Sequence, residues 1–261
     1  MFEVIGDSGP AVLLIPGGAE AVDGFFPGLA EGLMADPGCR VILVDRPGAG
    51  DSTVEGGLAD AAASLHATIV DAGVGPVVVI GQSLGGAVAL LLATTYPDDV
   101  AGVVLLDATP INDPKLARMV AQRMRTMERL FRVPVVRGIL SSLLRSSAKK
   151  SVRQHAMSDE YAAATHRIAS GIDIPKLGRA VVGMEDLADE FDATRLPQVP
   201  AVVITADRPL DDPLRRAHAR AAEALGAPLL SWPKAEHQVH LTHPAEVLDA
   251  SREVVRAAAA D

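Results

Sequence analysis

The chain has 261 residues, of which 49% are hydrophobic and 22% are charged, and its formal net charge at pH 7 is −9. This length suits one α/β domain with a sizeable core, and the composition excludes a disordered or fibrous protein. The negative charge argues against a general nucleic-acid binder.

The sequence carries no sign of export or of a metal site. Its single cysteine, Cys39, cannot form an internal disulfide, and no cysteine spacing suggests a metal. The first residues lack the basic and apolar layout of a signal peptide, and apolar runs such as Val77–Ile80 are too short to span a bilayer. We therefore expect a cytoplasmic protein without metal, cofactor or membrane partner.

Short apolar runs bounded by turn residues alternate with segments of helical period. The runs that read as buried strands are Ala11–Ile15, Val41–Val44, Val77–Ile80, Val103–Leu106 and Ala201–Ile204, and Leu229–Trp232 is a last candidate. This alternation predicts an α/β fold, with a mostly parallel sheet flanked by helices. In such sheets the chemistry collects at the carboxyl ends of the strands.

The strand pattern stops between Asp113 and about Leu196. Apolar residues there recur at three- and four-residue spacing, as in Leu116, Met119 and Val120, which is typical of one face of a helix. We expect a helical lid inserted between two strands, above the carboxyl edge of the sheet. Residues 1–110 and 197–261 would then form the core, and residues 111–196 the lid.

A G-x-S-x-G turn, Gly81-Gln82-Ser83-Leu84-Gly85, follows the strand Val77–Ile80 and precedes a helix over Ala87–Thr95. Such a turn strains the serine backbone so that the hydroxyl projects above the sheet, and glycine allows neighbouring chains to approach closely. A helix starting here points its positive dipole end at the reacting oxygen. Ser83 is the predicted nucleophile; the alternative is a plain strand–helix turn.

With two further segments, this turn resembles the α/β-hydrolase superfamily along nearly the whole chain. Asp45–Ser52 is similar to that family's turn after the strand preceding the nucleophile strand, and Ala235–Leu241 to the segment with its catalytic histidine. The resemblance is to lidded, serine-nucleophile esterases and thioesterases. It implies a Ser-His-Asp triad and no cofactor.

The base must be a histidine, because its pKa allows proton transfer near neutral pH. His237 stands first in the loop after the last strand candidate, at the matching family position, with His240 expected to pack below it. His66, His155, His166 and His218 lie in helical segments and are expected at the surface or in packing. His243 precedes Pro244 at a helix start.

The acid is less clearly specified by the sequence. The family usually places it in the turn after Ala201–Ile204, where this chain has Pro209 at the aligned position. Some relatives place it after the strand that follows the nucleophile helix, which here gives Asp107. We favour Asp107 over Asp207 and Asp211.

The resemblance also implies two backbone N–H donors for the developing oxyanion, those of Leu84 and Gly18. An ordinary turn is the alternative for Gly17-Gly18. Apolar side chains that could line an acyl pocket, or else pack in the core, are Phe25, Phe26, Met119, Met124, Met127 and Phe131.

These residues predict hydrolysis of an ester or thioester through an acyl-enzyme. The alternatives are a cofactor-free lyase or acyl-transfer enzyme on the same triad, and a non-enzymatic hydrolase-fold binding protein. The segment between Pro110 and Ala156 contains eleven Lys or Arg but only two acidic residues, Asp113 and Glu128. This basic lid is either a set of solvated helix faces or a docking surface for an acyl carrier protein or another anionic carrier.

Overall fold

The computed structural model describes residues 2–260, in which seven strands form one sheet in the order β1-β3-β2-β4-β5-β6-β7. β1 runs antiparallel to β3, and every other neighbouring pair is parallel. This confirms the predicted mostly parallel sheet. The strands are β1 (Phe2–Ile5), β2 (Ala11–Ile15), β3 (Arg40–Val44), β4 (Val77–Gln82), β5 (Val100–Leu106), β6 (Ala201–Ile204) and β7 (Leu229–Leu230).

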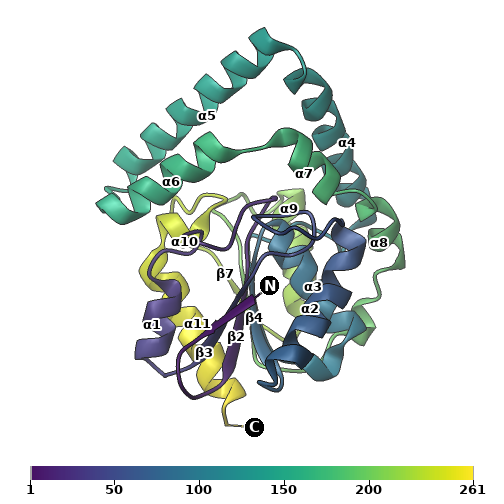
Figure 1. The fold of residues 1–261 in the computed structure, drawn as a ribbon, viewed down its shortest axis with the longest axis vertical. Coiled ribbons are helices and arrows are strands. Elements are labelled where there is room, and N and C mark those ends of the chain that lie inside the picture. Colours follow the sequence, from purple (N-terminus) through teal and green to yellow (C-terminus); the bar gives the residue numbers. More distant parts are fainter. Residues whose placement is uncertain (1, 261) are drawn as a thin grey trace.

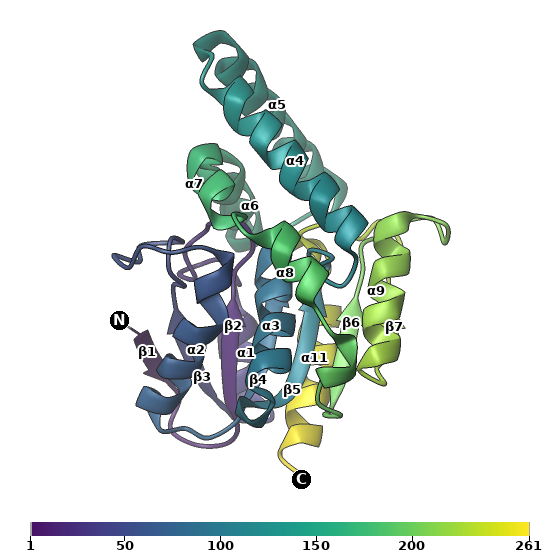
Figure 2. The ribbon, with the colours of Figure 1, turned by 90° about the vertical axis from the view of Figure 1, so that its right-hand side faces the viewer.

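Helices cover both faces of the sheet (Figures 1 and 2). α2 (Leu58–Ala72), α3 (Leu84–Thr95) and α9 (Pro213–Ala224) pack on one face, and α1 (Leu29–Ala35) and α11 (Pro244–Ala258) on the other. Along β2, Leu13 faces the first group of helices, whereas Val12 and Leu14 face the second. Because both faces are buried, these strands are continuous apolar runs rather than alternating ones.

The structure differs from the sequence prediction at the edges of the sheet. β1 was not predicted, since Phe2–Ile5 is short and only half-buried at the sheet edge. β7 comprises only Leu229–Leu230 and ends before the predicted Trp232. The helix after the nucleophile turn begins at Leu84, directly after Ser83, rather than at Ala87.

Five helices lie between β5 and β6, where the sequence predicts a helical insertion. We call residues 114–190 the cap. Its helices are α4 (Pro114–Phe131), α5 (Pro134–Gln154), α6 (Asp159–Gly171), α7 (Ile174–Ala180) and α8 (Met184–Glu190). α4 and α5 rise from the core and meet at an apex, with α6 and α7 beneath them (Figure 1). The division into core and lid stays a prediction.

No helix among residues 2–260 combines the length and the apolar character needed to cross a membrane.

The short helix α10 (Val239–Thr242) carries a buried histidine. The ring of His240 stacks on Phe25 at 5.0 Å between centroids and lies 5.1 Å from Phe26. Burial disfavours the charged imidazole and lowers the pKa of His240 to about 3. His240 therefore packs as a neutral aromatic residue below the histidine loop, as expected.

We predict that His240 makes the protein less stable in acid. In the unfolded chain its pKa returns to about 6.5, so the unfolded state binds a proton that the folded state excludes. This contribution to stability is complete above pH ~6.5 and falls by about 1.4 kcal/mol per pH unit as the pH drops toward 3. Between pH 7.5 and 5 the free energy of unfolding of wild type should fall by about 2 kcal/mol more than that of His240→Phe.

Urea unfolding of both proteins at the two pH values measures this difference, and every other titrating group is common to both. An equal pH dependence of the two proteins would contradict the assignment.

Candidate active site

Ser83 stands between the end of β4 and the start of α3 in a strained backbone conformation, with φ of 50°. Its N–H donates to Leu106 O at 3.0 Å, and its carbonyl accepts from Thr109 N at 2.8 Å, so both neighbouring peptides are held. A Cβ on Gly85 would collide with the carbonyl oxygens of Ile15 and Pro16. The glycine of the motif is thus required by the close approach of β2, which lets the turn present the Ser83 hydroxyl.

Ser83, His237 and Asp107 form a continuous hydrogen-bonded chain. His237 Nε2 lies 3.0 Å from Ser83 Oγ, and His237 Nδ1 lies 2.6 Å from Asp107 Oδ2. Because a carboxylate only accepts, Nδ1 carries the proton and Nε2 is free to accept the serine hydroxyl proton. Gln82 Nε2 donates to the carbonyl of His237 at 3.0 Å and fixes the histidine loop. The structure therefore brings the three predicted residues together.

The other two acid candidates point elsewhere. Asp207 is exposed and accepts a hydrogen bond from the Lys234 N–H at 2.8 Å, and Asp211 is also exposed. Within residues 2–260, neither forms a hydrogen bond or an ion pair with His237. Asp107 follows β5 in a left-handed conformation, with φ of 47°, and its side chain is only 1% exposed. Of the three carboxylates, Asp107 alone is placed to orient His237.

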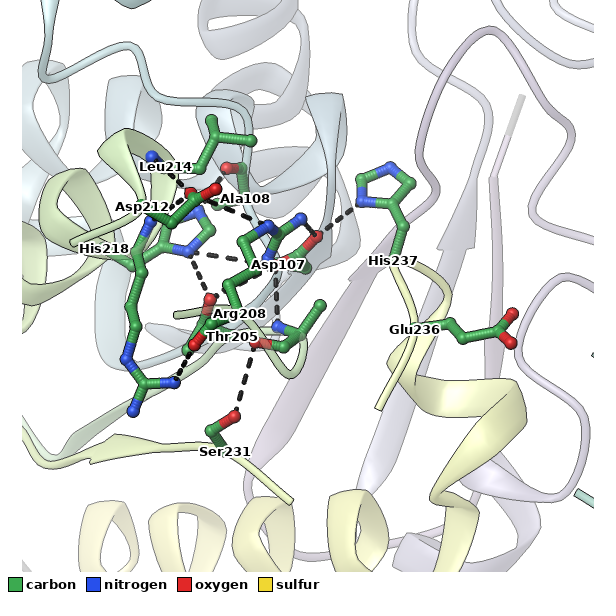
Figure 3. Close-up of polar contacts among 12 residues, drawn as sticks. Asp107, Ala108, Thr205, Arg208, Asp212, Leu214, His218, Ser231, Glu236 and His237 are labelled. Atoms are coloured by element: carbon green, nitrogen blue, oxygen red, sulfur yellow. Dashed lines mark hydrogen bonds and ion pairs between the residues drawn. The ribbon is translucent and has the colours of Figure 1, made fainter. Parts of the chain in front are cut away.

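Arg208 also binds Asp107, in an arrangement that the sequence did not reveal. Its guanidinium donates to both carboxylate oxygens, at 2.6 Å to Oδ2 and also to Oδ1, and Ala206 N donates to Oδ1 at 2.9 Å (Figure 3). Burial alone would raise the pKa of Asp107, but hydrogen bonds and charges from His237 and Arg208 outweigh it and hold that pKa far below its usual range. Asp107 is therefore an ionised carboxylate at any pH at which the protein would be assayed.

His218, from α9, fixes the turn that follows Asp107. The ring is buried, with Nε2 2.7 Å from Ala108 O and Nδ1 2.9 Å from Thr205 Oγ1 (Figure 3). Burial lowers the pKa of His218, so the ring is neutral and Nε2–H donates to the carbonyl. The expectation of a packing role holds for His218, although its contact with this turn could not be read from the sequence.

The segment between this turn and the cap is tied to α9 as well. Asn112 Nδ2 donates to Ala217 O at 2.8 Å, and Arg220 forms an ion pair with Asp113. Asp113 also caps α4, since its carboxylate accepts from the backbone N–H groups of Lys115 and Leu116 at 3.1 Å. The chain is therefore anchored to the core immediately before the cap begins.

The two predicted oxyanion donors both border the cavity above Ser83. Leu84 is the first residue of α3, so its N–H has no partner within the helix, and Gly18, with φ of 55°, lines the same cavity. The buried side chain of Arg46 donates to the carbonyls of Pro16, at 2.9 Å, and of Gly18. Burial lowers the pKa of Arg46 to about 10, which leaves it cationic at neutral pH. Arg46, which the sequence analysis did not single out, holds the Gly18 loop.

A cavity of about 620 Å³ opens between Ser83 and the cap. Of the six apolar side chains that the sequence offered for a pocket, Phe25 and Met124 line this cavity, whereas Phe26 is buried in the core. The cap contributes seven apolar residues to the cavity wall, namely Val120, Met124, Ile168, Ile172, Leu177, Val181 and Met184.

Both cationic side chains that line the cavity, Lys176 and Arg208, form hydrogen bonds within the protein. Lys176 Nζ donates to Gly50 O, and Arg208 is bound to Asp107. Glu20, Asp51 and Asp173 supply negative charge, and burial raises the pKa of Glu20. No cluster of His, Cys, Asp and Glu within residues 2–260 is suited to hold a metal ion.

The site thus joins a nucleophile turn to a histidine and a buried carboxylate. Residues 10–165 match the family model described as the alpha/beta hydrolase fold. The chain belongs to the α/β-hydrolase family. This confirms the resemblance on which the sequence prediction rested.

Curated relatives of this α/β-hydrolase match it over part of their length. Lipase LipV of Mycobacterium tuberculosis is 48% identical over 66 residues, 25% of this chain and 25% of its own. A 2-hydroxy-6-oxononadienedioate/2-hydroxy-6-oxononatrienedioate hydrolase of Burkholderia vietnamiensis is 33% identical over 113 residues, 42% of this chain and 39% of its own. The matched segments therefore span a quarter to two fifths of these relatives.

Among solved structures, a thermophilic esterase from Thermogutta terrifontis superposes with a TM-score of 0.72 at 23% identity. The superposition covers 99% of this chain and 93% of that one, and it is a likeness of fold. The names lipase, hydrolase and esterase agree with the hydrolase enzyme expected from the sequence.

We predict that Asp107→Asn lowers kcat by about 10³- to 10⁴-fold, because an amide cannot hold His237 in the reactive tautomer. Asp207→Asn is the matched control and should retain wild-type turnover, since that carboxylate binds a backbone N–H away from His237. Steady-state hydrolysis of a 4-nitrophenyl ester measures both. Thermal unfolding of each variant separates a loss of catalysis from a loss of fold. Equal losses in the two variants would contradict the assignment of the acid.

Proposed function

We propose that this α/β-hydrolase cleaves ester or thioester bonds of an uncharged acyl group through an acyl-enzyme on Ser83. The observation that carries the proposal is the hydrogen-bonded chain from Ser83 Oγ through the His237 ring to Asp107. A serine hydroxyl is a weak nucleophile unless an adjacent base removes its proton. His237 is within reach of that proton, and Asp107 is placed to stabilise the imidazolium that results.

In the first half of the reaction, Ser83 Oγ attacks the acyl carbon while its proton passes to His237 Nε2. The carbonyl oxygen becomes an oxyanion, and the backbone N–H groups of Gly18 and Leu84 are the donors we assign to it. Each such donor is worth about 3 kcal/mol of barrier. The tetrahedral intermediate then collapses: the bond to the leaving alcohol or thiol breaks, and His237 returns the proton to it.

In the second half, water replaces the leaving group. His237 takes a proton from the water as its oxygen attacks the acyl carbon. When the second intermediate collapses, the bond to Ser83 Oγ breaks, His237 returns the proton to Oγ, and the carboxylic acid is released. Asp107 remains ionised throughout, in keeping with its depressed pKa. No cofactor is needed for either half.

The cavity favours an uncharged, apolar acyl group. Its exposed wall is more apolar than polar, Arg208 is paired with Asp107, and Lys176 donates one hydrogen bond to Gly50 O. Glu20 and Asp173 would repel a substrate carboxylate. For this reason we prefer ester hydrolysis to the reaction of the Burkholderia relative, whose name specifies dioates.

We predict that a fluorophosphonate probe forms a stoichiometric adduct with Ser83, because the probe requires an activated serine. Ser83→Ala should take up no label and should lose at least about 10⁴-fold in kcat on a 4-nitrophenyl ester. Intact-protein and peptide mass spectrometry locate the adduct. Ser142→Ala, on the exposed face of α5, is the control and should behave as wild type. If the wild-type protein is folded but takes up no label and shows no multiple turnover, the binding-protein alternative is favoured.

We also predict discrimination between two substrates of equal chain length. 4-Nitrophenyl valerate should be hydrolysed with a kcat/KM at least about 100-fold above that of the 4-nitrophenyl monoester of glutarate, because burying an unpaired carboxylate costs several kcal/mol. Both release the same chromophore, so the comparison isolates the terminal charge. Equal rates would mean that the cavity supplies a cation to the substrate and would overturn the uncharged acyl class.

A further inference from the structure

Exposed apolar side chains are concentrated at the apex of the cap. Among residues 2–260, nine large apolar side chains are exposed, and five of them lie between positions 130 and 143. We call these five the apical ridge: Leu130 (43% exposed), Val133 (48%), Val135 (71%), Ile139 (56%) and Leu143 (60%). Concentration of apolar surface at one place on a protein marks an interaction site.

The exposed apolar residues of α5 form a stripe of their own, separate from the apolar residues that pack against the protein. Val135, Ile139 and Leu143 are spaced four residues apart and form one stripe along the helix. The half-buried residues Val136 and Leu140 follow a parallel stripe that turns inward, toward the rest of the cap. α5 therefore has two apolar stripes, and only one of them is covered.

Cations extend from the apical ridge along α5 toward its base. From Arg129 to Met157 the sequence contains seven Lys or Arg and neither Asp nor Glu. Arg132 pairs with Glu128 at 2.9 Å, whereas the other six make no ion pair within residues 2–260. These six exposed cations are Arg129, Arg137, Arg145, Lys149, Lys150 and Arg153. Lys150 lies seven residues after Leu143, so it continues the exposed stripe on the same face of α5.

The base of α5 is fixed to the core, which leaves the apical ridge projecting. Ser151 Oγ donates to Glu236 Oε2 at 2.8 Å, next to the histidine loop. From there α5 runs outward to the apex, away from the sheet (Figures 1 and 2). Since the whole chain carries a net charge of −9, a negatively charged surface would repel the core and attract this end of the molecule.

We propose that the apical ridge and its cations dock the protein onto an anionic phospholipid surface. Val135, Ile139 and Leu143 would enter the boundary between headgroups and acyl chains, and the Lys and Arg side chains would bind lipid phosphates. A projecting apex meets a flat surface first, which favours a bilayer over a carrier domain that must bring its acyl group to the cavity beneath the cap. The sequence-based expectation of no membrane partner considered only spanning segments. The proposal does not depend on the proposed hydrolysis.

Cosedimentation with lipid vesicles tests the docking surface. Wild type should bind vesicles made of equal parts phosphatidylcholine and phosphatidylglycerol, should not bind phosphatidylcholine alone, and should be released by high salt. Val135→Glu should weaken the partition coefficient by about tenfold, and Lys150→Glu by at least about fivefold.

Two variants are matched controls. Val70→Glu changes another exposed valine, on α2, and Arg216→Glu reverses an exposed cation on α9 that makes no ion pair within the described residues. Both should bind vesicles as wild type does. All four variants should keep wild-type hydrolysis of a water-soluble ester, which separates a failure of docking from a failure of the proposed catalysis.

Three outcomes would overturn the proposal. The first is that the wild-type protein binds anionic and zwitterionic vesicles to the same extent. The second is a dimer, detected by sedimentation velocity, that Val135→Glu dissociates in the absence of vesicle binding; the ridge would then bind a second copy of the chain. The third is binding of an acidic acyl carrier domain, but not of vesicles, with the same sensitivity to Lys150→Glu.

Discussion

The site depends on keeping one charge inside the protein. The Asp107 carboxylate is almost completely buried, and an isolated buried carboxylate would cost several kcal/mol and take up a proton. Two cationic or polar partners, Arg208 and His237, and the Ala206 N–H share its two oxygens. Because His237 and Arg208 together keep the carboxylate ionised, Asp107 can accept the His237 Nδ1–H, which leaves Nε2 to accept from Ser83 Oγ. The arrangement of Asp107, His237 and Ser83 therefore depends on the buried ion pair between Asp107 and Arg208.

The same interaction explains a departure from the usual family pattern. The turn after β6, where the family usually has its acid, supplies Arg208 here, and the carboxylate that contacts His237 follows β5. The two turns are neighbours, since β5 and β6 pair in parallel and Asp107 N donates to Ile204 O at 2.7 Å. A carboxylate after β5, paired with a cation after the neighbouring strand β6, can thus reach His237.

Much of this arrangement could be predicted from the sequence, because it is local. Val77–Gly85 specifies a strand, a tight turn and a helix through its own composition, and the buried strands are continuous apolar runs. Arg208 and His218 could not be assigned in the same way. Their partners, Asp107 and Ala108, lie about a hundred positions earlier in the chain, and only the fold brings them into contact. The helical period of the cap likewise predicts helices but not which stripe is covered, so the exposed Val135 and Ile139 look no different in sequence from core residues.

The proposed catalytic residues and much of the apolar lining of the cavity come from different parts of the chain. The core supplies Ser83, His237 and Asp107, whereas cap residues such as Met124, Leu177 and Met184 line the cavity above them. A change in the cap would therefore alter which acyl group fits without altering the hydrogen bonds of His237.

The anchoring of residues 108–113 to α9 bears on how such a protein can diversify. The acid and the first cap helix are only seven positions apart, yet His218, the Asn112 amide and the Asp113–Arg220 ion pair fix the connecting segment to the core. The anchored segment therefore offers a graft point: we expect that helices of different length or sequence can be exchanged after Asp113, by recombination or by design, while Asp107 keeps its contacts.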